Sequence, residues 1–301
     1  YWEGPNRNWY KVPEVVMELC DYIAEDDPNE VKMAVFPFPL NLWVRQYRPE
    51  IRLPFAWTER EDTDMENPII SWLFETDAVR VCPEGHPFWY TSGKLGPFYI
   101  NTQFLYGSEA AANALLAVIE EACAGDKLAF YDKVYAEIDK QLASCPIYAQ
   151  LIDLMTEAAR KLDVDFVSGG ERRDFFFSMP VARKLGLGHL SIFKDLSSVY
   201  TDGNGVSMPS EAAQLAGKRS VHIADLVTVA SSYIRAWIPA VEGLGAKIAY
   251  SLAVVDRDQG GSDILKNAGC PLTTLIVIKP ELFETAHRMG RITGKQLALV
   301  L

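Results

Sequence analysis

The sequence predicts an α/β fold built on a doubly wound parallel sheet. In its C-terminal half, apolar segments typical of strands alternate with helical segments of about 10–15 residues. The 301 residues suffice for one such domain and an extension, and a hydrophobic content of 49% supports a sizeable core. Ligands of open α/β sheets bind beyond the carboxyl ends of the strands, so the segments that follow strands are the first places to look for a site.

Residues 1–72 differ from the rest of the chain because they are rich in Trp, Pro and acidic side chains. Helical apolar spacing occurs at 15–23, and a strand that ends at a proline is expected at 31–36. We therefore expect residues 1–72 to form an extension packed on a main domain of residues 73–301.

Three helices are expected early in the main domain. The segment 108–124 has a Ser108 cap, many alanines, helical apolar spacing and a Gly125 stop. Similar spacing predicts helices at 129–144 and 148–162.

Strands and helices then alternate. A strand at 164–167 precedes a helix at 174–185, and a strand at 221–224 precedes a helix at 231–243 and a strand at 247–255. This order is the one that predicts the parallel sheet. In addition, residues 190–193 are strand-like, and the Gly- and Asn-rich segment 200–205 is expected to be a mobile surface loop.

Charge and cysteine usage limit the classes of function. A net charge of −11 argues against a general nucleic-acid surface, and no apolar run approaches the roughly 20 residues of a membrane span. The five cysteines are scattered and lack CxxC spacing, which argues against zinc and favours a reduced, cytoplasmic setting. The four histidines show no metal spacing, and His222 fits a core position, so no metal held by protein side chains is expected.

The most informative segment is 249–278, in which an apolar strand runs straight into Asp-Arg-Asp-Gln-Gly-Gly. An arginine flanked by acids and glycines beyond a strand end is suited to recognising an anion. Arg257 is therefore a candidate binding residue.

A second candidate is 168–174, where Gly169 and Gly170 are followed by Arg172 and Arg173 at the start of a helix. Free backbone amides at a helix start, together with two guanidinium groups, make an anion cradle. The alternative is a tight strand–helix turn with solvated arginines.

A third candidate combines Asp225 at a strand end with Thr228, Ser231 and Ser232. A carboxylate there can accept hydrogen bonds from ribose hydroxyls, and small hydroxyl residues at a helix N-terminus can hold a phosphate. The alternative is that these side chains are ordinary helix caps.

A fourth candidate, 88–100, contains a glycine turn, Lys94 and the aromatic pair Phe98–Tyr99. Aromatic faces beside a cation suit a flat anionic ring. A β-hairpin with core aromatics is the alternative.

Taken in this order, the segments resemble the type I phosphoribosyltransferases, and within that family the orotate phosphoribosyltransferases, over about residues 73–282. Residues 74–79, leading to TSGKLGPFYIN, are similar to the family's N-terminal hood, here 73–107. The VVDRDQGG stretch is similar to the loop on the orotate side, and AGCPLTTL to the strand that follows it.

The resemblance implies roles for the candidates. Arg257 would pair with the orotate ring or its carboxylate, and Phe98 and Tyr99 would line the base pocket. Asp225 matches the second acid of the phosphoribosyl-pyrophosphate signature, and Lys194 matches the lysine of the family's Arg-Lys pair. These groups are expected to converge on one cavity at the strand tips. The further substrate-binding candidates are Lys94, Gly169, Gly170, Thr228, Ser231 and Ser232.

The chain also departs from the family's pattern. Ala224 replaces the first acid of the signature, Ala230 a glycine of the phosphate loop, and Thr91 a lysine. Phe177 falls on the pyrophosphate-binding lysine, and Phe193 on the arginine of the Arg-Lys pair. Each lost charged hydrogen bond costs roughly 1.5–3 kcal/mol, and together these losses could abolish turnover.

Two functions follow. The first is transfer of phosphoribose from phosphoribosyl pyrophosphate to orotate, with Mg²⁺ brought by the pyrophosphate, in a cytoplasmic homodimer. Arg173, about one helical turn before Phe177, would then supply the missing positive charge and act in catalysis with Lys194 and Asp225. The second is a catalytically degenerate homologue that binds a nucleotide or base and acts in regulation or scaffolding, as the apolar replacements indicate.

Overall fold

The computed structural model describes residues 2–3, 9–10, 67–89, 93 and 95–301, and the chain divides into units of residues 1–66 and 67–301. In the first unit, β1 (Trp2–Glu3) pairs in antiparallel fashion with β2 (Trp9–Tyr10). The helix expected at 15–23 and the strand expected at 31–36 lie outside the described residues.

The second unit contains a seven-stranded sheet in the order β10-β9-β8-β7-β11-β12-β13. The strands β8, β7, β11, β12 and β13 run parallel, and β9 and β10 complete one edge in antiparallel pairing. Their bounds are Phe166–Gly170 for β7, Gly188–Ile192 for β8, Ser198–Thr201 for β9, Ser207–Pro209 for β10, Arg219–Val227 for β11, Lys247–Asp256 for β12 and Leu272–Val277 for β13. The predicted α/β fold with a mainly parallel sheet is confirmed.

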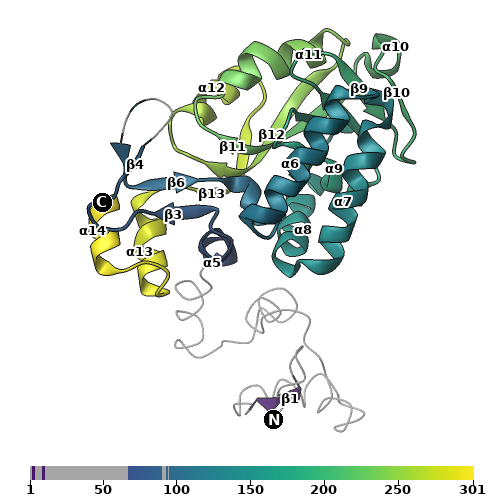
Figure 1. Cartoon of the computed structure of the whole chain (residues 1–301). Coiled ribbons are helices and arrows are strands. Elements are labelled where there is room, and N and C mark those ends of the chain that lie inside the picture. The colour runs from purple at the N-terminus through teal and green to yellow at the C-terminus, as the bar shows by residue number, and fades with distance from the viewer. Residues whose placement is uncertain (1, 4–8, 11–66, 90–92, 94) are drawn as a thin grey trace, which may run out of the picture. The chain divides into compact units, whose positions relative to one another are not determined.

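Each face of the sheet buries its own hydrophobic cluster. Val167 and Val221 belong to the cluster that contains residues of α7 (Phe130–Ser144), α8 (Pro146–Arg160) and α9 (Phe175–Leu185). Phe166, the residue before Val167, belongs to the other cluster, with Trp237 and Val241. Figure 1 shows α6 to α9 on one side of the sheet and α11 and α12 on the other. Strands covered on both faces are the mark of a doubly wound sheet.

The expected helices form close to their predicted positions. In α6 (Glu109–Ala124), the Ser108 hydroxyl accepts the Ala111 amide at 3.1 Å, and Gly125 is the C-cap. The helix α8 begins at Pro146 rather than at 148, since proline is tolerated in a first helical turn.

The helix predicted at 231–243 is irregular. It starts as a π-helical turn at Tyr233–Trp237 and continues as α11 (Ile238–Glu242). Pro239 has no amide hydrogen to donate back into the preceding turn, which accounts for the break in the regular pattern.

Residues 200–205 form part of a hairpin rather than a separate loop. Tyr200 and Thr201 belong to β9, and the Asp202 carboxylate then accepts the amides of Asn204 and Val206, both at 2.9 Å. Short-range bonding by an aspartate closes the turn before β10. The remaining short elements are the 3-10 helices Thr102–Tyr106 (η1) and Lys127–Ala129 (η2), α10 (Ala212–Leu215) and α12 (Gly261–Asn267).

The helix α5 (Pro68–Glu75) leads into the predicted hood, residues 73–107, in which β3 (Val79–Val81) pairs with β6 (Phe98–Ile100). Between them lies the small hairpin β4 (Phe88–Trp89) and β5 (Leu95–Gly96).

Two helices late in the chain hold the hood, α13 (Pro280–Arg288) and α14 (Gly294–Val300). The Phe98 ring lies 5.0 Å from the Phe283 ring, and the Gln296 amide donates to the Val81 carbonyl at 3.1 Å. Figure 1 shows these helices beside β3 and β6.

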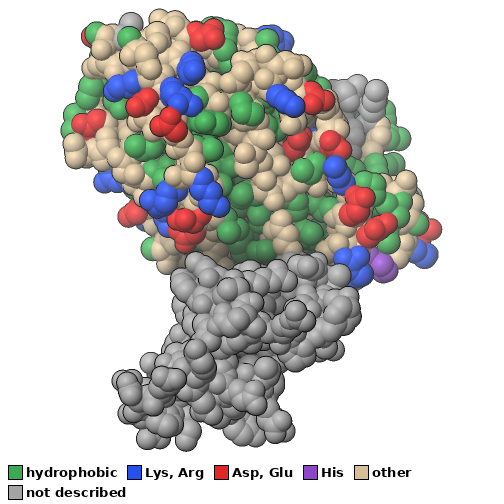
Figure 2. Space-filling model, turned by 180° about the vertical axis from the view of Figure 1, so that it is seen from behind, with side chains coloured by type: hydrophobic (Ala, Val, Ile, Leu, Met, Phe, Trp, Pro, Cys, Tyr) green, Lys and Arg blue, Asp and Glu red, His purple; other side chains and the backbone are tan. Residues whose placement is uncertain are grey.

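The outer surface carries mixed charge. On the face shown in Figure 2, Lys and Arg side chains are interspersed with Asp and Glu over the described residues. None of the helices in the described ranges is long and apolar enough to cross a membrane.

Candidate functional site

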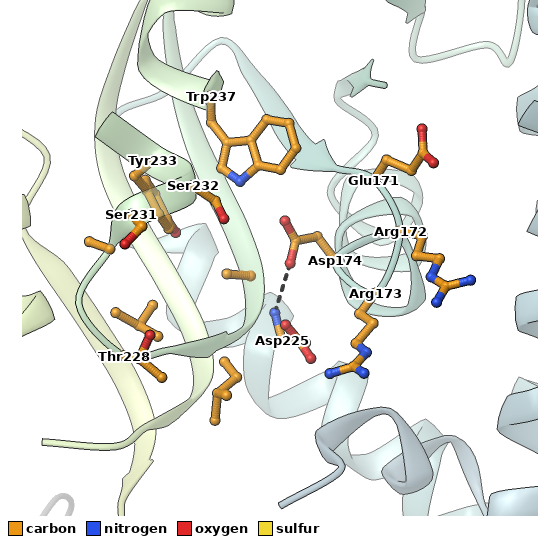
Figure 3. A pocket seen from close by; sticks show the side chains of 14 residues that line it. Glu171, Arg172, Arg173, Asp174, Asp225, Thr228, Ser231, Ser232, Tyr233 and Trp237 are labelled. Carbon is orange, nitrogen blue, oxygen red and sulfur yellow. Dashed lines mark hydrogen bonds between the residues drawn. The ribbon is translucent and has the colours of Figure 1, made fainter. Parts of the chain in front are cut away.

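A pocket of about 340 Å³ lies at the carboxyl ends of β7 and β11, the central strands of the sheet. Residues 171–174 form one wall, residues 224–233 form the other, and Trp237 closes one end (Figure 3). Five predicted site residues line this pocket: Arg173, Asp225, Thr228, Ser231 and Ser232. It is located where a doubly wound sheet binds its ligands.

The glycines predicted as part of an anion cradle are the last residues of β7, and both are buried. A Cβ atom on Gly169 would lie 2.1 Å from the Ser178 hydroxyl, and one on Gly170 would lie 2.3 Å from the Trp237 ring. The glycines therefore allow α9 and Trp237 to approach the strand closely. The Gly170 amide is used within the protein, since it donates to the Asp174 carboxylate at 3.1 Å.

Two arginines follow in the wall formed by residues 171–174, and they have different surroundings. Arg172 forms an ion pair with Glu120 of α6. The Arg173 guanidinium lies beside the Asp225 carboxylate in Figure 3, and its positive charge offsets part of the rise in the pKa of that carboxyl that burial and Asp174 cause. Of the two arginines, Arg173 is thus the one whose charge acts on Asp225 in the pocket.

The opposite wall presents hydroxyl groups. Thr228, Ser231 and Ser232 line the pocket after β11 ends, and Ser232 makes no side-chain capping bond to the following helical turn. Ala230 adopts a left-handed conformation with φ +51°, a conformation that glycine takes most easily. The Ser232 hydroxyl is therefore not used as a cap for this turn.

The main electrostatic feature is a pair of buried carboxylates. Asp174 is 8% exposed and Asp225 9% exposed, and the Asp225 amide donates to the Asp174 carboxylate at 3.1 Å. Burial, followed by the negative charge of Asp174, raises the pKa of Asp225 to about 7. The carboxyl of Asp225 can therefore carry a proton near neutral pH.

A polar chain continues from Asp174 into the core. Its carboxylate lies 3.4 Å from Nε2 of His222, whose Nδ1 is 3.0 Å from the Ser168 hydroxyl. His222 is fully buried and stacks on Trp237, with 6.0 Å between the rings. This histidine is buried in the core as expected. It also contacts Asp174 in one wall of the pocket and Trp237 at the pocket's end.

A second hollow of about 530 Å³ adjoins the first, sharing with it Glu171, Arg172, Ser232 and Trp237. Lys194 and Arg235 complete its basic lining. The Lys194 amide donates to the Glu171 carboxylate at 2.8 Å, which fixes the backbone at the lysine. Lys194 thus lies next to the pocket rather than in it.

Arg257, Phe98 and Tyr99, the described candidates on the base side, are not among the residues that line either hollow. Arg257 directly follows β12, and its amide donates to the Val227 carbonyl at 2.9 Å, so its backbone lies next to the end of β11. Phe98 and Tyr99 lie in β6 of the hood, where the Tyr99 ring is 6.1 Å from Phe88. Lys94 lies outside the described residues.

Two aromatic departures from the family's pattern are core residues. Phe177 is fully buried in α9, and Phe193 is buried with its ring 5.0 Å from the Phe130 ring. Charged side chains at these positions would have to be buried, so the replacements fit the packing of this chain.

Among the residues that line the pocket, sequence reasoning did not single out Asp174, Tyr233 and Trp237. The sequence pattern places Asp174 at the start of a helix and both aromatics in a helix interior. The available signal was an acid directly after two arginines, in a segment already identified as a candidate.

Proteins similar to this chain in sequence are phosphoribosyltransferases. The orotate phosphoribosyltransferase of Rhodopseudomonas palustris (strain BisB5) is 31% identical over 131 residues, 42% of this chain and 70% of that protein. The adenine phosphoribosyltransferase of Paraburkholderia phymatum is 32% identical over 135 residues, 42% of this chain and 71% of that protein. No protein-family model matches the chain.

The fold is also similar to a solved structure, that of Leishmania donovani UMP synthase. The TM-score is 0.54 at 16% sequence identity, over 78% of this chain and 41% of that longer chain. At this identity, the similarity supports the fold alone.

Proposed function

Because this chain belongs to the type I phosphoribosyltransferase family, we propose that it transfers phosphoribose from phosphoribosyl pyrophosphate to orotate, giving orotidine 5′-phosphate. The observation that carries the proposal is the pocket between the ends of β7 and β11, in which hydroxyl groups face an arginine and two carboxylates. Mg²⁺ would enter as part of the substrate, bound to its pyrophosphate oxygens.

The two walls suit the two ends of the phosphoribosyl donor. Thr228, Ser231 and Ser232 offer hydroxyl donors to the 5′-phosphate, and Asp225 can bind a ribose hydroxyl. Arg173 in the pocket and Lys194 in the adjoining hollow would stabilise the pyrophosphate as it leaves. A chain with a net charge of −11 needs such local donors to hold a polyanion.

In the transfer, the C1′–oxygen bond breaks and its electron pair leaves with pyrophosphate. N1 of the base gives up its proton to solvent and uses the freed electron pair to bond to C1′. Positive charge develops on the ribose and negative charge on the departing group, so catalysis rests on positioning and electrostatics. We assign the base to the side of Arg257, Phe98, Tyr99 and Lys94, with Gly169 and Gly170 shaping the strand end behind the pocket.

The competing proposal is a catalytically degenerate homologue that binds the nucleotide or base and regulates or scaffolds a partner. It is favoured by Ala224 and by the buried Phe177 and Phe193. Both proposals include a homodimer located in the cytoplasm.

Pyrophosphate release from phosphoribosyl pyrophosphate and Mg²⁺, measured with orotate and separately with adenine, tests the assignment. We expect pyrophosphate release when orotate is the base and none when adenine is the base. Release with adenine alone would refute the choice of base. Calorimetric binding of phosphoribosyl pyrophosphate without turnover of either base would favour the degenerate homologue.

A further inference from the structure

Asp174 has contacts that the proposed transfer does not yet explain. One oxygen of its carboxylate accepts the Asp225 amide at 3.1 Å, and the other accepts the Gly170 amide at 3.1 Å. The second oxygen also lies 3.4 Å from Nε2 of His222. One side chain thus connects the end of β7, the end of β11 and a histidine of the core.

These contacts are buried, which makes them consequential. Asp174 is 8% exposed and His222 fully buried, and His222 Nε2 makes no hydrogen bond that would compete with its approach to the carboxylate. Hydrogen bonds to a buried ionised carboxylate are stronger than neutral ones. The side chain is therefore held in place with its carboxylate facing the pocket, as Figure 3 shows.

The position of this carboxylate is informative because Ala224, where the resemblance leads us to expect an acid, also lines the pocket. The methyl group of alanine supplies no charge. The negative charge beside Asp225 comes instead from Asp174, in the loop that follows the neighbouring strand β7.

We propose that Asp174 is a positioning residue of this pocket, which supplies from the β7 side the second carboxylate that is absent at position 224 and fixes the backbone of Asp225. This inference rests on the proposed function only for what the pocket binds. The pairing of the two carboxylates stands on the geometry of the unliganded protein.

The expected consequence concerns the proton on Asp225. The charged or titratable groups around it are Asp174 and Arg173 in the adjacent loop, with Tyr233 of the π-helical turn in the pocket wall. His222 is the further group that faces Asp174. Removing the Asp174 charge leaves Arg173 as the dominant charge near Asp225, so Asp225 should ionise more readily.

The first test needs no variant and no ligand. Carbon-13 NMR titration of the aspartate carboxyls in the full chain should show an apparent pKa for Asp225 well above the ordinary aspartate value. An Asp225 that titrates at the ordinary value, independently of Asp174, would overturn the proposal.

The second test compares Asp174→Asn with the matched control Asp165→Asn. Asp165 also accepts a backbone amide across the sheet, that of Arg219 at 2.7 Å, but it is exposed and precedes β7 at the opposite end of the strand. Asp174→Asn should lower the apparent pKa of Asp225 by about one unit or more. It should also weaken calorimetric binding of Mg²⁺–phosphoribosyl pyrophosphate about tenfold, since one charged hydrogen-bonding group is lost. Asp165→Asn should change neither quantity, and equal effects of the two variants would contradict the proposal.

The third test moves the carboxylate. The double variant Ala224→Asp/Asp174→Asn should regain a raised Asp225 pKa and part of the lost affinity. Failure to regain the raised pKa would show that Asp174 does not stand in for position 224. If neither the wild-type protein nor any variant binds phosphoribosyl pyrophosphate, the proposed function fails. The NMR measurements of the Asp225 pKa still decide the role of Asp174 in that case.

Discussion

The two walls of the pocket differ in the chemistry of their side chains. The β7 side, residues 171–174, is charged, and its side chains are tied by Glu120, the Gly170 amide and His222. The β11 side, after Asp225, presents small hydroxyl residues and a left-handed alanine. The difference teaches that charge in this pocket comes from the end of β7, whereas the end of β11 supplies mainly hydroxyl groups. Four changes would break or sharpen this contrast.

The largest effect is expected for Arg173→Ala, which removes the central cation of the β7 wall. Loss of a charged hydrogen bond should weaken binding of phosphoribosyl pyrophosphate about ten- to a hundred-fold, and Arg173→Lys should be milder because the charge is kept. Calorimetry measures the affinity. The control is Arg160→Ala, an exposed arginine of α8 paired with Glu157 at 3.2 Å. A binding loss in the control as large as in Arg173→Ala would remove the special role of the β7 wall.

The next effect concerns the strand end that supports both walls. Gly170→Ala places a methyl group 2.3 Å from the Trp237 ring, so the variant should lose about 1–3 kcal/mol of unfolding free energy through overpacking. Urea denaturation measures the change. Gly125→Ala is the control, because its added carbon would meet its nearest neighbour at 3.6 Å, an ordinary contact. Equal stability of the two variants would mean that Trp237 does not pack closely on β7.

A pH-dependent effect is expected from the proton on Asp225. Its pKa in the folded protein, about 7, is higher than in the unfolded chain, so the folded state binds this proton more tightly. The resulting stability is fully present below about pH 4 and is lost as the pH rises towards 7. Asp225→Asn should remove this part of the pH dependence.

The measurement is the difference in unfolding free energy between wild type and Asp225→Asn from pH 4 to 8. The difference is needed because burial lowers the pKa of His189 to about 3, which gives the opposite slope. Stability from His189 is present above about pH 6.5 and decreases as the pH falls. A wild-type-minus-variant difference that is constant with pH would contradict the raised pKa of Asp225.

The smallest effect is expected for Ala230→Gly on the β11 side. A left-handed alanine costs about 1–2 kcal/mol, and glycine costs about 0.5–1 kcal/mol in chain entropy, so the net gain should lie between zero and about 1.5 kcal/mol. A small rise in the thermal midpoint would report it. A fall would show that the alanine methyl contributes packing worth more than the strain.

Much of the fold could be predicted because local patterns decide it. The Ser108 cap, the Gly125 stop and the alternation of strands with helices needed no knowledge of distant contacts. The hydroxyls at 228, 231 and 232 were found for the same reason, since they directly follow a strand.

The role of Asp174 could not be predicted in this way. Its partners, Asp225 and His222, are about fifty residues away in the sequence, and only the parallel pairing of β7 with β11 brings them together. The irregular turn at Tyr233–Trp237 was missed because apolar spacing does not distinguish a π-helical turn from an α-helix.

The attachment of α13 and α14 to the hood has a consequence for biosynthesis. Val81 is hydrogen-bonded to Gln296, and Asn67 is hydrogen-bonded to Leu275. The N-terminal part of this domain therefore depends on partners that are translated more than two hundred codons later. Until residue 296 has been translated, the β3–β6 ribbon lacks its lateral support. A nascent chain stalled before residue 283 would also lack the Phe283 ring that packs against Phe98.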